Sequence, residues 1–251
     1  MKEPSQEQAI KLDALAIGAH PDDVELGCGG TVAKLARLGR RVGILHLTRG
    51  ERGTRGTVEE RLAEAAAAAA ALGAAEVLYL DCGDGALRTG PEEEDALIEI
   101  LRSRRPELVL GPSRSDRHPD HGRAHRLTEA ACYYAGLANR GSGAPHRPAA
   151  FFSYMQNDSF EPSFVVDVTA DWETKRRSLR AYRSQLFQAD APEERRGEPV
   201  TKVSTEDFSL MIEGRARHYG SLIGATFGEP FWNRLPLAVG DPFDILPGGV
   251  R

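Results

Sequence analysis

Leu-Asp-Ala-Leu-Ala-Ile-Gly-Ala-His-Pro-Asp-Asp, residues 12–23, is the stretch of this chain that decides its fold. The apolar run at residues 12–18 predicts a buried strand, and the apolar residues of 31–38 recur at helical spacing. Pro21 fixes its own φ and biases His20 away from helical geometry, so His20 is expected at the carboxyl end of the strand. The first predicted unit is therefore a strand that feeds a helix through one histidine and two aspartates.

The two aspartates of this turn allow two interpretations. His20 and Asp23 are three residues apart, so their side chains can converge on one point while Asp22 points elsewhere. Alternatively, the two acids only cap a helix N-terminus, where carboxylates are favoured. This stretch alone leaves both interpretations open.

A second cluster, Asp116-Arg117-His118-Pro119-Asp120-His121, follows an apolar run at residues 107–112 and precedes a helical pattern at residues 122–137. If residues 12–18 are the first strand, this cluster ends the fourth. In a doubly wound sheet the active crevice lies outside the carboxyl ends of the strands where their order reverses. We predict an α/β, Rossmann-like three-layer fold with a mostly parallel sheet and the active site at the carboxyl ends of strands one and four.

These side chains have the chemistry of a metal hydrolase. Two imidazoles and one carboxylate form a zinc site with a fourth position left for water, and iron(II), manganese or cobalt would also accept them. The residues that we assign as metal ligands are His20, Asp23 and His121. Asp22 then suits a general base, and His118 suits a protonated group that donates to an oxyanion. Asp120 would orient one of the imidazoles.

The two motifs, Ala-His-Pro-Asp-Asp at 19–23 and His-Pro-Asp-His at 118–121, resemble the signature of the LmbE/PIG-L family of zinc-dependent N-deacetylases. The resemblance extends through most of residues 12–225. Within the family, the chain is most similar to the enzymes of bacillithiol biosynthesis, which hydrolyse N-acetylglucosaminyl-malate to the free amine. The resemblance implies the same roles for five of these residues: His20, Asp23 and His121 as ligands, Asp22 as the base and His118 as the residue that faces the oxyanion. It also implies a homo-oligomer, since relatives are often hexamers.

Three further positions are interpreted through this resemblance. Arg61 lies in the first turn of a helix predicted from Thr57, where a cation opposes the helix macrodipole and is typical of a solvated surface. Asp84 alone is typical of an Asx-turn. The resemblance implies instead that Arg61 faces the substrate and that Asp84 binds sugar hydroxyls. Phe208 stands where some relatives carry a tyrosine that approaches the active site.

Length and composition are compatible with this interpretation. The 251 residues suit one domain, with a polar segment at 1–11 and a proline-rich tail at 230–251. A net charge of −5 argues against a nucleic-acid partner. The three cysteines form no Cys-x-x-Cys and are expected to be reduced thiols. Without an apolar leader or a bilayer-length apolar run, we expect a cytoplasmic enzyme that acts on a small sugar conjugate rather than on a membrane.

Two rival functions remain open. One is the same chemistry on another N-acetylglucosamine derivative, such as a mycothiol-type conjugate, a chitin oligosaccharide or a glycopeptide precursor. The other is a non-catalytic nucleotide-binding protein in which residues 27–30, Gly-Cys-Gly-Gly, cradle a phosphate. That glycine pattern has low specificity, and the acids just before it would repel a phosphate.

Two segments are expected at the surface. Residues 49–56 are rich in glycine and charge and should form a mobile loop beside the crevice. Residues 171–188 predict a helix with a solvated basic face, which consists of Lys175, Arg176, Arg177 and Arg180.

Overall fold

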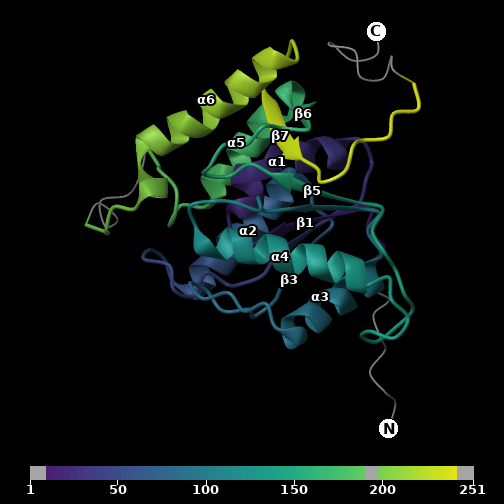
Figure 1. Cartoon of the computed structure of the whole chain (residues 1–251). Coiled ribbons are helices and arrows are strands. Elements are labelled where there is room, and N and C mark those ends of the chain that lie inside the picture. The colour runs from purple at the N-terminus through teal and green to yellow at the C-terminus, as the bar shows by residue number, and fades with distance from the viewer. Residues whose placement is uncertain (1–9, 190–196, 242–251) are drawn as a thin grey trace.

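The computed structural model describes residues 10–189 and 197–241 as a sheet covered by helices on both faces (Figure 1). The strand order is β3-β2-β1-β4-β5-β7-β6. The strands are β1 (Ala14–Gly18), β2 (Val42–His46), β3 (Glu76–Tyr79), β4 (Leu108–Gly111), β5 (Ala150–Tyr154), β6 (Phe164–Asp167) and β7 (Gly228–Trp232). The first five pair in parallel, and β7 runs antiparallel to both β5 and β6. The predicted α/β architecture is confirmed, with strands one and four as neighbours.

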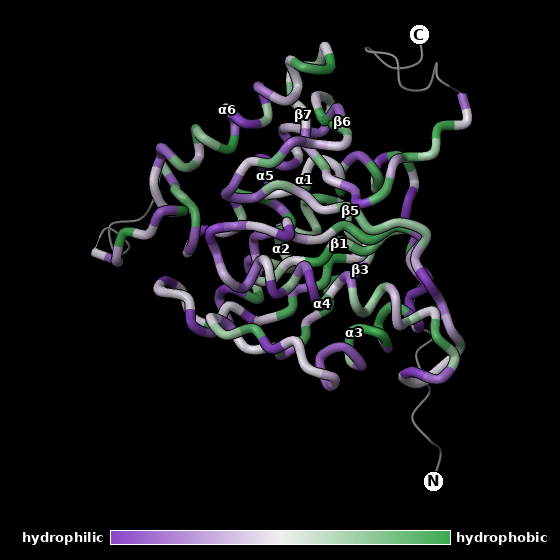
Figure 2. The backbone as a smooth tube through the Cα atoms, in the orientation of Figure 1, coloured by the Kyte–Doolittle hydropathy of each residue, from purple (hydrophilic) through white to green (hydrophobic). Residues whose placement is uncertain are grey.

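The helices are α1 (Asp23–Arg37), α2 (Val58–Leu72), α3 (Pro91–Arg104), α4 (Pro119–Tyr134), α5 (Trp172–Ala181) and α6 (Glu206–Leu222). Side chains of β1 alternate between the two faces, as the period of a strand requires. Leu15 and Ile17 pack with residues of α3 and α4, whereas Ala14 and Ala16 pack with α1. Figure 2 shows that the hydrophobic residues concentrate in the central strands.

Local signals set several helix ends. Thr57 accepts a hydrogen bond from the backbone N–H of Glu60, whose carboxylate accepts one from the N–H of Thr57, so the predicted capping box begins α2. This helix ends at Gly73, which has a φ of 78°. Pro91 occupies the first turn of α3, where its missing N–H has no helical partner to lose.

The structure corrects parts of two predictions, the start of the proline-rich tail and the solvated basic face of the helix at 171–188. Residues 230–232 belong to β7 rather than to a tail, because the buried Phe231 fills the core between β5 and β6. Lys175 is buried at 1% exposure and pairs with Glu229, so it is not part of a solvated face. The helix predicted over 171–188 ends at Ala181.

Parts of two predictions lie outside the described residues, namely 1–9 of the polar segment and 242–251 of the tail. Within the described ranges, no helix is both long and apolar enough to cross a bilayer. The three cysteines are buried and free.

Candidate active site

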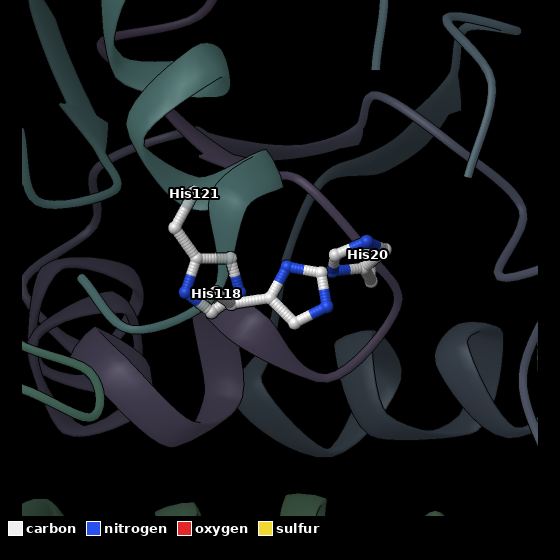
Figure 3. Close-up of side chains that lie close together, drawn as sticks. All are labelled: His20, His118 and His121. Carbon is white, nitrogen blue, oxygen red and sulfur yellow. The ribbon is translucent and has the colours of Figure 1, made fainter. Parts of the chain in front are cut away.

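The fold brings the two histidine and aspartate motifs together. His20 follows β1 and His118 is the N-cap of α4, after the neighbouring β4. Figure 3 shows the rings of His20, His118 and His121 grouped at this point. Their centroids lie 4.8 Å apart for His20 and His118, 4.9 Å for His118 and His121, and 5.7 Å for His20 and His121.

The two histidines assigned as ligands each lie close to one oxygen of the Asp23 carboxylate. The Nδ1 of His20 lies 3.5 Å from Asp23 Oδ2, and the Nε2 of His121 lies 3.2 Å from Asp23 Oδ1. Ligand bonds of 2.0–2.1 Å at tetrahedral angles place neighbouring ligand atoms about 3.3 Å apart. His20, Asp23 and His121 are all buried. Two imidazoles and a carboxylate are a donor set that a divalent metal ion accepts, so these three residues remain the proposed ligands. They are not among the described groups whose ligand atoms all lie within 4.8 Å of one another.

Carboxylates on the far side of each imidazole select the nitrogen that would face a metal. His20 Nε2 lies 3.3 Å from Asp120 Oδ2 and 3.2 Å from Asp84 Oδ1, which favours a proton on Nε2 and leaves Nδ1 free. His121 Nδ1 lies 2.9 Å from Asp116 Oδ1, which leaves its Nε2 free. Such carboxylate–histidine pairs orient ligands and raise their basicity.

Two other groups that contain His20 have ligand atoms that all lie within 4.8 Å of one another. His118 joins His20 and His121 within 4.8 Å, and Asp84 and Asp120 form a second group with His20. The Nδ1 of His118, however, accepts a hydrogen bond from the backbone N–H of Asp120. The carboxylate of Asp120 in turn accepts from the N–H groups of Gly85 and Leu87. The Asp120 carboxylate also contacts His20 Nε2, so its predicted role of orienting an imidazole is compatible with its position.

Asp22 has a different environment from Asp23. It precedes α1 with a φ of 107°, which is strained for a residue with a side chain, and its carboxylate forms no capping hydrogen bond. The interpretation of both acids as helix caps therefore fails for Asp22. Burial, and then the neighbouring Asp23 carboxylate, raise the pKa of Asp22 to about 7. A carboxyl group with such a pKa suits proton transfer near neutral pH.

His118 is a neutral donor in this arrangement rather than a histidinium. Burial, and then the positive charges of His20 and His121, lower the pKa of His118. Its Nδ1 accepts the Asp120 N–H at 3.2 Å, so the proton of the neutral ring is on Nε2. His118 lines the cavity and can donate a hydrogen bond there.

These groups line a cavity of about 260 Å³. Its other polar walls include Arg52, Arg61, Asp84, Arg117 and Arg215, and one apolar wall consists of Leu26, Val203, Phe208 and Ile212. No tyrosine is among the described residues of this lining. Phe208 therefore presents a ring without a hydroxyl group at the position considered for a phenolic donor.

Arg61 lies in the cavity wall but has other partners. Its Nη1 donates to the carbonyl of Gly50 at 2.8 Å, and its Nη2 donates to the carbonyl of Pro21 at 3.1 Å. The residue is 5% exposed, so the solvated-surface interpretation is wrong. Arg61 links the turn at Pro21 to the loop that follows β2, while its buried Nε has no hydrogen-bond partner among the described residues.

The sequence analysis missed two residues with direct contacts to the assigned ligands. Asp116 lies inside the second motif but was given no role, although its spacing of five residues before His121 is a detectable signal. Although burial opposes it, the hydrogen bond from His121 lowers the pKa of Asp116. Gln156 donates to Asp23 Oδ1 at 2.6 Å and lies 3.4 Å from His121 Nε2. Its only signal is its position after β5, the strand beside β4.

The glycine-rich stretch does not form a phosphate cradle. Residues 27–30 lie inside α1, where a side chain at Gly27 would meet the Tyr154 ring at 2.1 Å. The N–H groups of Gly30 and Thr31 donate to the carboxylate of Glu229 at 2.9 and 2.6 Å. An internal carboxylate thus occupies the position that a nucleotide phosphate would need, and the nucleotide-binding alternative loses its site.

Comparison with known proteins shows the family to which the chain belongs. The family model described as GlcNAc-PI de-N-acetylase, PIG-L, matches residues 15–132. The chain is 34% identical over 188 residues to the diacetylchitobiose deacetylase of Thermococcus kodakarensis, a match that covers 68% of this chain and 69% of that enzyme. The chain belongs to the PIG-L family.

Two further relatives show how far this PIG-L family match extends. A conserved protein from Thermus thermophilus has a solved structure with a TM-score of 0.83 and 38% identity, covering 92% of this chain and 98% of that one. The 1D-myo-inositol 2-acetamido-2-deoxy-α-D-glucopyranoside deacetylase of Nocardia farcinica is 34% identical over 166 residues. That match covers 52% of this chain and 54% of the enzyme, so the chain spans about half the length of this relative.

Proposed function

We propose that this protein is a metal-dependent deacetylase that hydrolyses the N-acetyl group of an N-acetylglucosamine conjugate. The observation that carries this proposal is the meeting, in one cavity, of a fitting metal-ligand set with a second carboxylate, Asp22, and an imidazole donor, His118. The deacetylase relatives, whose names describe N-acetylglucosamine derivatives, support the same substrate class.

His20, Asp23 and His121 would hold the metal, with zinc as our first choice and iron(II), manganese or cobalt as alternatives. When bound, the metal would supply Lewis-acid activation of the water and of the amide carbonyl. Asp22, with its raised pKa, takes the proton of the attacking water. The Nε2–H of His118 donates to the oxygen that becomes negatively charged. Protonated Asp22 then supplies the proton that the leaving amine needs.

Within this class, we propose N-acetylglucosaminyl-malate as the preferred substrate, by resemblance to the bacillithiol branch. Arg117 lines the cavity, is exposed, and has no ion pair among the residues that the structure describes. Its guanidinium suits a malate carboxylate. A chitin-derived disaccharide, a mycothiol-type conjugate and a glycopeptide precursor are the alternatives. The first of these carries no carboxylate for Arg117 to bind.

The test is amine release by metal-stripped protein with and without one equivalent of zinc. The substrates are N-acetylglucosaminyl-malate, N-acetylglucosamine and diacetylchitobiose. Zinc-dependent release that favours the malate conjugate is expected. Zinc-dependent release that favours diacetylchitobiose would keep the deacetylase and reject the malate substrate. Metal binding without release of amine from any N-acetylglucosamine compound would reject the proposed activity.

The Asp22→Asn variant tests the proposed base. It preserves the size of the side chain but removes its ability to hold a proton, so kcat should fall about 100-fold or more. Zinc content should stay at that of the wild type, because Asp22 is not an assigned ligand. Asp158→Asn is the matched control, since Asp158 is exposed and outside the cavity. Turnover close to that of the wild type in Asp22→Asn would exclude Asp22 as the base.

A further inference from the structure

Helix α1, which begins at the catalytic turn, is broken at Cys28. The backbone of Cys28 has a φ of −143° and a ψ of 22°, which are not helical angles. In an unbroken helix the N–H of Gly30 would donate to the carbonyl of Leu26. At this break the Gly30 N–H donates to Glu229 instead, and the Leu26 carbonyl accepts from Lys175. Both side chains belong to residues far from α1 in the sequence.

A buried ion pair bridges the two ends of the break. Lys175 Nζ donates to the Leu26 carbonyl at 3.0 Å and to Glu229 Oε1 at 2.6 Å. The same Glu229 oxygen accepts the N–H of Gly30 at 2.9 Å. Its other oxygen accepts both the N–H and the hydroxyl of Thr31 at 2.6 Å. The side chains of Lys175 and Glu229 are each 2% exposed, so the pair is out of contact with solvent.

The Leu26 carbonyl is also connected to the active site, through Arg215. Arg215 Nη2 donates to Leu26 O at 3.1 Å, and its Nη1 donates to the carbonyl of Gln156. The side chain of Gln156 donates to the assigned ligand Asp23. Charge-assisted hydrogen bonds therefore connect Lys175 to Asp23, in the N-terminal turn of α1, by way of the Leu26 carbonyl, Arg215 and Gln156. Buried and charge-assisted bonds of this kind fix geometry strongly.

We infer that Lys175 and Glu229 are positioning residues that set the direction of the first turn of α1, and thereby the place of Asp22 and Asp23 in the cavity. The pair replaces the missing helical hydrogen bond, so α1 can bend at Cys28 without leaving buried backbone groups unpaired. This inference rests on the proposed function only through the metal site. It requires no particular substrate.

The experiment compares Glu229→Gln with the control Glu76→Gln. Glu76 also forms an ion pair, with Arg104 at 3.0 Å, but at the amino end of β3, away from the cavity. Both variants would be titrated with cobalt(II), whose visible absorption reports the geometry of its ligands. We expect Glu229→Gln to bind cobalt(II) about tenfold or more weakly and with a changed spectrum. Glu76→Gln should match the wild type in affinity and spectrum.

Thermal unfolding of the same variants separates an effect on the geometry of the metal site from a general loss of stability. If Glu229→Gln melts at a lower temperature but binds cobalt(II) with unchanged affinity and spectrum, the inference is wrong. Should Glu229→Gln fail to fold, Thr31→Val removes only one of the hydrogen bonds to Glu229. It should weaken cobalt(II) binding about twofold or more, and unchanged binding would overturn the inference.

The proposed function is tested separately by amine release from the wild type. A wild-type protein that binds cobalt(II) but deacetylates nothing would reject the proposed function, while the cobalt titration of the variants would still decide the role of the Lys175–Glu229 pair.

Discussion

Asp116 contacts a proposed metal ligand, His121, without belonging to the proposed ligand set. Its carboxylate lies 2.9 Å from His121 Nδ1 and also accepts the backbone N–H groups of His118, Asn157 and Asp158. The carboxylate is thus held rigidly, and it fixes the nitrogen of His121 that faces the metal. Because the ligand depends on this partner, the two should act as one unit.

We expect Asp116→Asn to weaken zinc binding about 10- to 100-fold, since the amide removes the charge and presents N–H groups to other donors. Competition with a chromophoric chelator measures this affinity. Asp158→Asn, at an exposed side chain in the loop between β5 and β6, should bind zinc like the wild type. Equal affinities for the two variants would show that Asp116 does not support the site.

Arg61 and Arg117 should differ in their effects on substrate choice. Because the two Nη atoms of Arg61 bond to backbone carbonyls, Arg61→Ala should reduce kcat/KM about equally for N-acetylglucosaminyl-malate and N-acetylglucosamine. Arg117→Ala should reduce it about tenfold or more for the malate conjugate only, because a charge-assisted pair is lost. Steady-state kinetics with both substrates decides this. A selective loss in Arg61→Ala would return the carboxylate-binding role to Arg61.

At this scale residue types and spacing in the two motifs led to a proposed ligand set, but they did not lead to Asp116, which lies inside the second motif. His20, Asp23 and His121 could be proposed as ligands because their residue types and spacing suit a metal. The burial of Arg61 could not be predicted, because its partners are backbone carbonyls of another turn and another loop. Gln156 gave no signal, since a single glutamine after an apolar strand has many structural uses.

Among the elements, α1 depends on a very close approach to β5. A side chain at Gly27 would lie 2.1 Å from the ring of Tyr154. The ring has little room to move, because the Tyr154 hydroxyl donates to the Ile17 carbonyl of β1 at 2.8 Å and the residue is fully buried. The glycine therefore permits the contact that places the catalytic turn over the sheet.

Gly27→Ala should lower the free energy of unfolding by about 1–3 kcal/mol through overpacking. Gly214→Ala is the matched control, because Gly214 also lies within a helix, α6, and a side chain there meets nothing within 4 Å. It should raise the free energy of unfolding by about 0.5–1 kcal/mol, since alanine favours the helix. Urea denaturation measures both values. A stabilised Gly27→Ala variant would contradict the close contact.

The elements were predictable where a local pattern specified them. The capping box at Thr57 and the proline at 91 gave the starts of α2 and α3, because both signals are local chemistry. Strand β7 was missed because it contains Pro230 and owes its place to the antiparallel partners β5 and β6. Lys175 was misplaced for the same reason, since its partner Glu229 lies 54 residues away. The implied homo-oligomer stays a prediction, as the structure describes one chain.

For the whole molecule, metal binding should couple to stability. His20 and Asp23 come from the turn after β1, whereas His121 comes from α4, so a bound ion would connect two units of the fold. A ligand that binds only the native state stabilises it by about 2.7 kcal/mol at a free concentration of 100 times its Kd. For a chain of this size, that corresponds to a Tm increase of about 5–10 °C.

We therefore expect removal of the metal by a chelator to lower the Tm, and zinc to restore it in proportion to the logarithm of its free concentration. Differential scanning calorimetry of the stripped and reloaded protein measures the shift. The Asp23→Asn variant should lose the zinc-dependent part of the shift, because it removes the carboxylate that both assigned histidines face. Asp167→Asn, at an exposed carboxylate of β6, should retain it. If zinc raised the Tm of Asp23→Asn as much as that of the wild type, the stabilising ion would bind elsewhere in the chain, and the assignment of Asp23 as a ligand would be wrong.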